Sequence, residues 1–254
     1  MTHFDTGSDQ RPPMALFGAE PFRAAMEFAW HTFGWPATPT PGDGHPVVIF
    51  PGLGADGNSV ATLRAHCRSL GYQAFDWGQG TNTGPRGDLE TWLQTLKSQM
   101  VELLRDHTQP ATFIGWSLGG VYAREVAKLM APGIRQVITM GTPFNMRGDH
   151  THVSSQFHML NGSFSTIYPW LNQRLRTPPP MRTTSIYSKS DGIVDWQSCR
   201  HDTQSSLVQD IEVDGSHMGM GWNRDVLAAV ADRLAQPTGP CQRYEPAPRV
   251  GCWA

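Results

Sequence analysis

Several classes of protein are excluded by what this chain has little of. Charged residues make up 17% of its 254 residues, and the 20 basic side chains do not outnumber the 22 acidic ones. Binding to nucleic-acid phosphates needs a basic surface, so no nucleic-acid partner is expected. No apolar run approaches the roughly 20 residues that span a bilayer. The polar N-terminus lacks the basic and apolar regions of a signal peptide, so we expect a cytoplasmic protein without an integral membrane segment.

Cysteine is scarce as well. The four cysteines show no metal-ligand spacing, so no metal site is expected. A chain of this length buries about 70–75% of its unfolded surface and needs no disulfide to fold. Cys241 and Cys252 lie in a Pro-rich tail, and their pairing in an oxidising compartment stays open.

Glycine and proline, in contrast, are frequent, with 26 and 20 residues. Their share exceeds the average but stays below the roughly 25–30% typical of disorder. Much of the proline lies at 36–46, at 178–180 and in the C-terminal tail. These positions divide a single domain, 1–254, into an N-terminal helical extension (1–45), a core (about 46–235) and a tail (236–254). Within the extension, residues 1–20 look loosely ordered and a helix is expected at 22–33.

Across the core, short apolar runs alternate with segments of helical periodicity. This alternation predicts a mostly parallel sheet of six or slightly more strands, with helices on both faces. The predicted strands are 47–50, 72–77, 111–116, 134–140, 183–187 and 207–213, and the predicted helices are 58–70, 88–104, 118–130 and 222–234.

About 40 residues between the fourth and fifth predicted strands contain no clear strand. Insertions of this length in a compact domain usually serve a function, so a cap or lid is expected at about 144–181. Its many aromatic and methionine side chains fit a cover over an acyl or lipid-like substrate. They fit equally well a structural cap that buries its own helices.

The segment 115–119 reads G-W-S-L-G, a G-x-S-x-G pattern with Ser117 at its centre. The pattern is weak alone, but a predicted strand precedes it and a predicted helix follows it, as a nucleophile elbow requires. A side chain at Gly115 or Gly119 would collide with neighbouring elements in such a turn. The alternative is an ordinary strand-to-helix turn with an incidental serine.

A serine nucleophile needs a histidine base. Among the ten histidines, His217 is the one between the last predicted strand and the last predicted helix, and glycines flank it. The remaining histidines lie before the first strand, in helices, in the insertion or ahead of the sixth strand, and are expected to be bystanders: His3, His45, His31, His66, His107, His150, His152, His158 and His201.

The base needs an acid that holds its tautomer. Asp191 lies just past the fifth predicted strand, next to Gly192. Asp195 is the rival, but it lies beyond the apolar pair at 193–194 and is expected to face solvent. Weaker candidates lie on or next to the histidine's own strand: Asp210, Glu212 and Asp214.

An oxyanion needs two backbone N–H donors. Leu118 follows the nucleophile and supplies one, and the glycine-rich segment 50–54 after the first strand supplies the other, with Leu53 as the expected donor. A plain glycine-rich turn is the alternative. A phosphate loop fits less well, because the segment has no lysine.

Together, segments 50–54, 115–119, 190–194 and 215–217 resemble the four active-site loops of the α/β-hydrolase superfamily. The resemblance covers most of the chain, about 46–235, and is strongest to small bacterial lipases and carboxylesterases. Many relatives have His-Gly where this chain has Pro51-Gly52, which leaves the backbone donor in place. The resemblance implies an α/β-hydrolase fold and a carboxylesterase or triacylglycerol-lipase-like enzyme that needs no cofactor.

The implied reaction is ester cleavage through an acyl-enzyme, with Ser117 as nucleophile, His217 as base and Asp191 as acid. The substrate would be a small-molecule or lipid-like ester. An acyltransferase, thioesterase or polyester depolymerase could use the same residues. A non-catalytic binding protein is a remote alternative, because all three positions are filled. A haloalkane dehalogenase is disfavoured, because the elbow carries serine rather than aspartate. Acyl chain length and oligomeric state do not follow from the sequence.

Overall fold

The computed structural model describes residues 12–33, 42–145 and 169–246. Its centre is a six-stranded sheet in the order β2-β1-β3-β4-β5-β6, in which every neighbouring pair is parallel. The strands are β1 (Pro46–Phe50), β2 (Gln73–Asp76), β3 (Ala111–Trp116), β4 (Ile134–Met140), β5 (Arg182–Ser188) and β6 (Val208–Val213). This arrangement confirms the predicted fold class.

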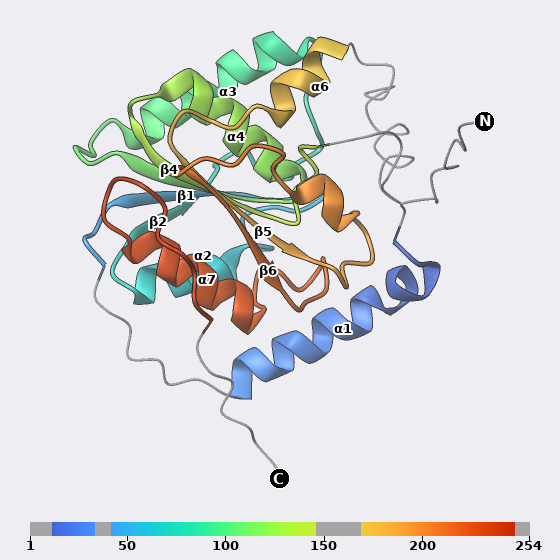
Figure 1. Ribbon diagram of the computed structural model, residues 1–254. Helices are drawn as coiled ribbons and strands as arrows, with labels where there is room; N and C mark the ends of the chain where they lie inside the picture. The colour runs from blue at the N-terminus through green and yellow to red at the C-terminus, as the bar shows by residue number, and fades with distance from the viewer. Residues whose placement is uncertain (1–11, 34–41, 146–168, 247–254) are drawn as a thin grey trace.

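Helices cover both faces of the sheet (Figure 1). On one face lie α3 (Leu89–Leu104) and α4 (Leu118–Met130), and on the other lie α2 (Ala61–Ser69) and α7 (Arg224–Ala235). The short α6 (Pro169–Arg176) packs beside α4, where Lys128 Nζ donates to the carbonyl of Arg174 at 2.7 Å. A 3-10 helix, η1 (Trp196–Cys199), follows β5.

The core is built on strands that are buried on both faces. Every residue of β1 and β5 is buried. For β1, this explains why the strand reads as a continuous apolar run rather than as an alternating one, whereas β5 buries several polar side chains. Alternate side chains feed two apolar clusters, one beneath α2 and α7 and the other beneath α3 and α4. Each fully buried large side chain contributes roughly 1.5–3 kcal/mol relative to exposure.

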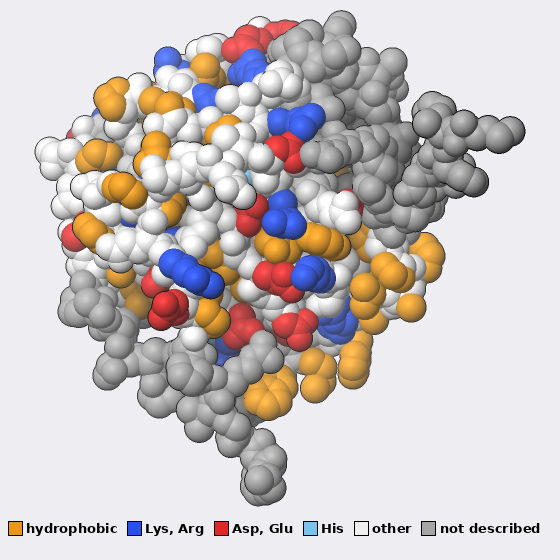
Figure 2. Space-filling view, in the orientation of Figure 1, with side chains coloured by type: hydrophobic (Ala, Val, Ile, Leu, Met, Phe, Trp, Pro, Cys, Tyr) orange, Lys and Arg blue, Asp and Glu red, His pale blue; other side chains and the backbone are white. Residues whose placement is uncertain are grey.

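The N-terminal helix α1 (Met14–Phe33) is longer than predicted, because it begins within the part expected to be loosely ordered. It lies outside the two layers, beyond the end of β6, and contacts α7 (Figure 1). Two of the apolar side chains that predict this helix are largely exposed, Phe22 at 71% and Met26 at 46%, whereas Phe28 packs edge-on against Trp222. Figure 2 shows hydrophobic side chains gathered along this edge of the molecule.

Most of the predicted cap lies outside the described residues, so its structure stays a prediction. The pairing of Cys241 with Cys252, which the sequence leaves open, involves a residue outside the described range as well. None of the described helices is long and apolar enough to cross a bilayer.

Candidate active site

Parallel strands bring the predicted site residues to one edge of the sheet. Ser117 follows β3, Asp191 follows β5 and His217 follows β6, so all three lie beyond the carboxyl ends of the strands. In open α/β sheets, ligands bind at this edge.

Ser117 occupies a strained backbone position between β3 and α4. Its φ is 53°, and it is the only described residue other than glycine with a positive φ. A residue in such a region costs about 1–3 kcal/mol and persists only where its surroundings hold it. Here the amide of Ser117 donates to the carbonyl of Met140 at 2.8 Å, and its carbonyl accepts from Gly120 at 3.0 Å. The strain is therefore stabilised by the neighbouring strand and by the first turn of the helix.

Glycines make this turn possible, as the sequence predicted. A Cβ on Gly115 would overlap the backbone of Gly120, and a Cβ on Gly119 would overlap the carbonyls of Phe50 and Pro51. The start of α4 therefore packs directly against the loop that follows β1.

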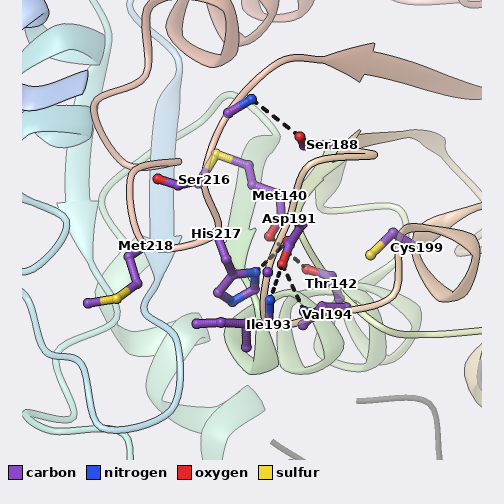
Figure 3. Close-up of polar contacts among 12 residues, drawn as sticks. Met140, Thr142, Ser188, Asp191, Ile193, Val194, Cys199, Ser216, His217 and Met218 are labelled. Carbon is purple, nitrogen blue, oxygen red and sulfur yellow. Dashed lines mark hydrogen bonds and ion pairs between the residues drawn. The ribbon is translucent and has the colours of Figure 1, made fainter. Parts of the chain in front are cut away.

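His217 and Asp191 face each other in a buried pair, with Nδ1 of the histidine 2.7 Å from Oδ2 of the aspartate (Figure 3). The other carboxylate oxygen, Oδ1, accepts from the amides of Ile193 and Val194, each at 2.8 Å. The two residues are only 4% and 3% exposed. These contacts hold the carboxylate from two sides and engage Nδ1 of the histidine, so Nε2 is the ring nitrogen that Asp191 does not contact.

Burial disfavours a charged His217, but the charge and hydrogen bond of Asp191, together with the charge of Glu20, outweigh burial and hold the pKa of His217 above its ordinary value. A raised pKa makes the imidazole a stronger proton acceptor once it is neutral.

The loop that carries His217 is anchored on the elbow by a tryptophan. The indole Nε1 of Trp116 donates to the carbonyl of His217 at 3.1 Å, and the two rings lie 6.1 Å apart. Among the described residues, no hydrogen bond joins Oγ of Ser117 to His217. Such bonds are often long without substrate and shorten in the Michaelis complex.

The loop after β1 approaches Ser117 closely. A Cβ on Gly52 would lie 3.3 Å from Cβ of Ser117, so this position has little room for a side chain. In the described part of the chain, the amides of Leu53 and Leu118 donate to no other group. Both predicted oxyanion donors are therefore available to a ligand.

Asn82 holds this loop in place, a role that no sequence pattern indicates. Its side-chain amide donates to the carbonyl of Pro51 at 2.8 Å. Its backbone carbonyl accepts from Gly54 at 2.8 Å, and its amide donates to Ala55 at 2.8 Å. Asn82 is fully buried, so the loop is held by three bonds sheltered from water.

Asp195, the rival acid, was expected to face solvent, but the structure buries it. It is 5% exposed, and its Oδ1 accepts from the amide of Gln197 at 3.1 Å, at the start of η1. Among the weaker candidates, Asp210 contacts His201, Glu212 pairs with Lys189, and Asp214 accepts from Ser190.

Glu20 and Glu27 of α1 contact the loops that carry Asp191 and His217. Neither residue was identified from the sequence. With Arg23 they form a polar stripe at helical spacing, a signal that the apolar residues of the helix concealed. In residues 12–33, 42–145 and 169–246, no group of three or more His, Cys, Asp or Glu side chains is arranged to hold a metal ion.

The family model described as "Alpha/beta hydrolase family" matches residues 29–251. The chain belongs to the alpha/beta hydrolase family. No curated protein matches this hydrolase.

Solved structures share the hydrolase fold at low identity. Lipase B of Aspergillus fumigatus is 16% identical with a TM-score of 0.56, over 82% of this chain and 56% of that one. The monoacylglycerol lipase of Paleococcus ferrophilus is 15% identical with a TM-score of 0.56, over 78% and 96%. The thioesterase domain from the curacin biosynthetic pathway is 13% identical with a TM-score of 0.52, over 75% and 90%. The present chain thus spans little more than half of the lipase B chain.

Proposed function

We propose that this hydrolase cleaves carboxylic esters through an acyl-enzyme, with Ser117 as nucleophile, His217 as general base and Asp191 as the acid that orients the base. The observation that carries the proposal is the buried contact of 2.7 Å between His217 and Asp191, at the sheet edge where Ser117 is held at a positive φ. Two structures of the same fold come from proteins described as lipases, which favours an ester substrate.

In the proposed reaction, Oγ of Ser117 attacks the ester carbonyl while Nε2 of His217 takes its proton. Asp191 keeps the other proton of the ring on Nδ1 and stabilises the imidazolium. The amides of Leu53 and Leu118 donate to the oxyanion as negative charge develops on it. His217 then protonates the leaving alcohol, and a water molecule activated by the same histidine cleaves the acyl-enzyme.

Replacement of the nucleophile tests this function. Ser117→Ala should abolish cleavage of a p-nitrophenyl ester and labelling by a fluorophosphonate probe, while the protein stays folded. Ser98→Ala is a matched control, because Ser98 is an exposed serine of α3 whose hydroxyl only donates to the carbonyl of Gln94. Retained activity or labelling in Ser117→Ala would exclude the proposed nucleophile.

Thioester cleavage is a second candidate, because a thioesterase domain shares this fold and the same acyl-enzyme would form from a thioester. Matched oxygen esters and thioesters of graded acyl length would separate the two. The enzyme is an esterase if kcat/KM for the oxygen ester is the higher at each length. Product analysis with an added alcohol would distinguish hydrolysis from acyl transfer.

A further inference from the structure

The N-terminal helix is bound to both loops that carry the proposed acid and base. Near its start, the backbone of Leu16 lies so close to Gly192 that a Cβ on this glycine would be 2.5 Å from it. At the other loop, Nε1 of Trp222 donates to the carbonyl of Ala24 at 2.9 Å. The helix thus bridges two loops that are separated by β6 in the sequence.

Glu20 is the centre of this bridge. It is 1% exposed, although carboxylates are rarely buried without partners. Its Oε1 accepts from the amide of Gly192 at 2.7 Å and from the amide of His217 at 3.1 Å, and its Oε2 accepts from Met218 at 2.9 Å. One carboxylate therefore holds the backbone of the proposed base and of the residue that follows the proposed acid.

Two neighbours on the same helix face extend the contact. Arg23 donates to the carbonyl of Ser190 and, at 2.8 Å, to its hydroxyl, and it lies 3.7 Å from Glu20. Glu27 accepts from the amide of Ser216 at 2.7 Å. The polar stripe of α1 therefore faces the backbone of residues 190–192 and 216–218, which explains why the apolar side of the helix faces outward.

We propose that Glu20 is a positioning residue, which holds the loops of Asp191 and His217 in the relative position that proton transfer from Ser117 requires. This proposal rests on the proposed function. Hydrogen bonds to a charged acceptor are about twice as strong as neutral ones, and three of them converge here on one carboxylate. A shift of about 1 Å in a catalytic group lowers the rate by up to roughly a hundredfold. A loop that loosens and lets His217 shift should therefore lower kcat.

The charge of Glu20 provides a readout that a purely structural contact would not give. Charged groups near His217 come from its own loop (Asp214), the acid loop (Asp191) and α1 (Glu20, Arg23 and Glu27). The charge of Glu20 adds to that of Asp191 in raising the pKa of His217. Since the base works in its neutral form, removing this charge should lower the pKa and move the acid limb of the kcat/KM profile to lower pH.

Glu20→Gln is the first test, measured on a p-nitrophenyl ester across pH. The amide cannot accept from all three N–H groups, so kcat should fall about 10- to 100-fold, with a smaller change in KM and an acid limb at lower pH. Glu125→Gln is the matched control. Glu125 is 2% exposed and pairs with Lys128 and Arg174, away from both loops. The Glu125→Gln variant should be less stable, yet the acid limb of its kcat/KM profile should stay at the same pH.

Glu20→Asp provides a second variant, which keeps the charge but is one methylene too short for all three bonds. Its kcat should fall. Its acid limb should move less from that of the unaltered enzyme than the acid limb of Glu20→Gln moves. A folded Glu20→Gln with unchanged kcat and acid limb would overturn the proposal, as would an equal shift of the acid limb in Glu125→Gln.

Titration of the His217 imidazole by NMR separates this proposal from the proposed function, because it needs no turnover. The measurement uses Ser117→Ala with and without Glu20→Gln, and the pKa of His217 should be lower in the double variant. An unchanged pKa would overturn the role of Glu20. If Ser117→Ala retained activity, the proposed function would fail, whereas the titration would still decide whether Glu20 acts on His217.

Discussion

His217 and His201 are alike on one side of the ring and different on the other. Each turns Nδ1 toward an aspartate, at 2.7 Å from Asp191 and 2.6 Å from Asp210. Both rings are buried. A histidine–aspartate contact alone would therefore identify either pair as a proton acceptor and its orienting acid.

The difference lies at Nε2. In His201 this nitrogen is 2.9 Å from Nη1 of Arg124. Arginine only donates, so the nitrogen must accept and the ring must be neutral. Arg124 is itself buried, stacks on Phe144 at 3.8 Å and donates to the carbonyl of Leu175. In the described part of the chain, no group hydrogen-bonds Nε2 of His217.

The pKa values of the two rings follow from these neighbours. Burial, assisted by the charge of Arg124, outweighs Asp210 and lowers the pKa of His201, whereas the charges of Asp191 and Glu20 raise that of His217. Burial lowers the pKa of Arg124 to about 10, so the cation beside His201 stays charged at neutral pH. The neighbours of Nε2 and the nearby carboxylates, rather than the aspartate at Nδ1 alone, therefore set His217, the proposed base, apart from His201.

The largest expected effect comes from replacing each of the two histidines in turn. His217→Gln should lower kcat/KM for a p-nitrophenyl ester by about 10,000-fold or more, because the proton of Ser117 loses its acceptor. His201→Gln should leave the activity close to that of the unaltered enzyme and lower the free energy of unfolding by about 1–3 kcal/mol, because Arg124 loses a buried acceptor. Ester kinetics and urea unfolding of both variants check the pair. The distinction breaks down if the two replacements cost similar activity.

Replacing each aspartate by asparagine sharpens the same comparison. Asp191→Asn should lower kcat by about 1,000- to 10,000-fold, because an amide no longer holds the proton on Nδ1 of His217. The acid limb of the remaining activity should move to lower pH, because the charge that raises the pKa of His217 is gone.

Asp210→Asn is the matched control, because it makes the same change beside the other histidine. It should cost stability but leave the acid limb unchanged. A shift of the acid limb in Asp210→Asn would show that both pairs titrate with catalysis, contrary to their proposed separation.

Much of the fold could be predicted because its signals are local. The segments 111–116, 118–130 and 134–140 were predicted with the bounds the structure shows, since apolar strands and glycine-containing turns mark their own ends. Glycines around Ser117 and His217 likewise pointed to the loops that the fold brings to one edge.

What the sequence did not reveal depends on contacts between distant residues. Glu20 is separated from His217 by most of the chain, and nothing in the local periodicity of α1 shows that backbone amides satisfy its carboxylate. Asp195 is a different case, because its contact with the amide of Gln197, two residues on, is local and forms where η1 begins. The pair of His201 and Asp210 forms only because β6 runs beside the loop after η1.

The smallest expected effect is the pH dependence of stability, which should differ in sign between the two histidines. The pKa of His201 is lowered on folding, so the unfolded chain binds the proton more readily, and stability falls as pH drops below about 6.5. The pKa of His217 is raised, so its contribution is present below about 6.5 and is lost as pH rises through the folded pKa.

Each group can change the slope of stability by at most about 1.4 kcal/mol per pH unit. Burial also lowers the pKa of His45, so this residue adds to the loss of stability as the pH falls. Urea unfolding between pH 5 and 8 should therefore give a flatter acid side for His201→Gln than for the unaltered protein. For His217→Gln, the loss of stability on the alkaline side should be smaller. Parallel curves for the two variants would mean that Nε2 and its neighbours do not set the two rings apart.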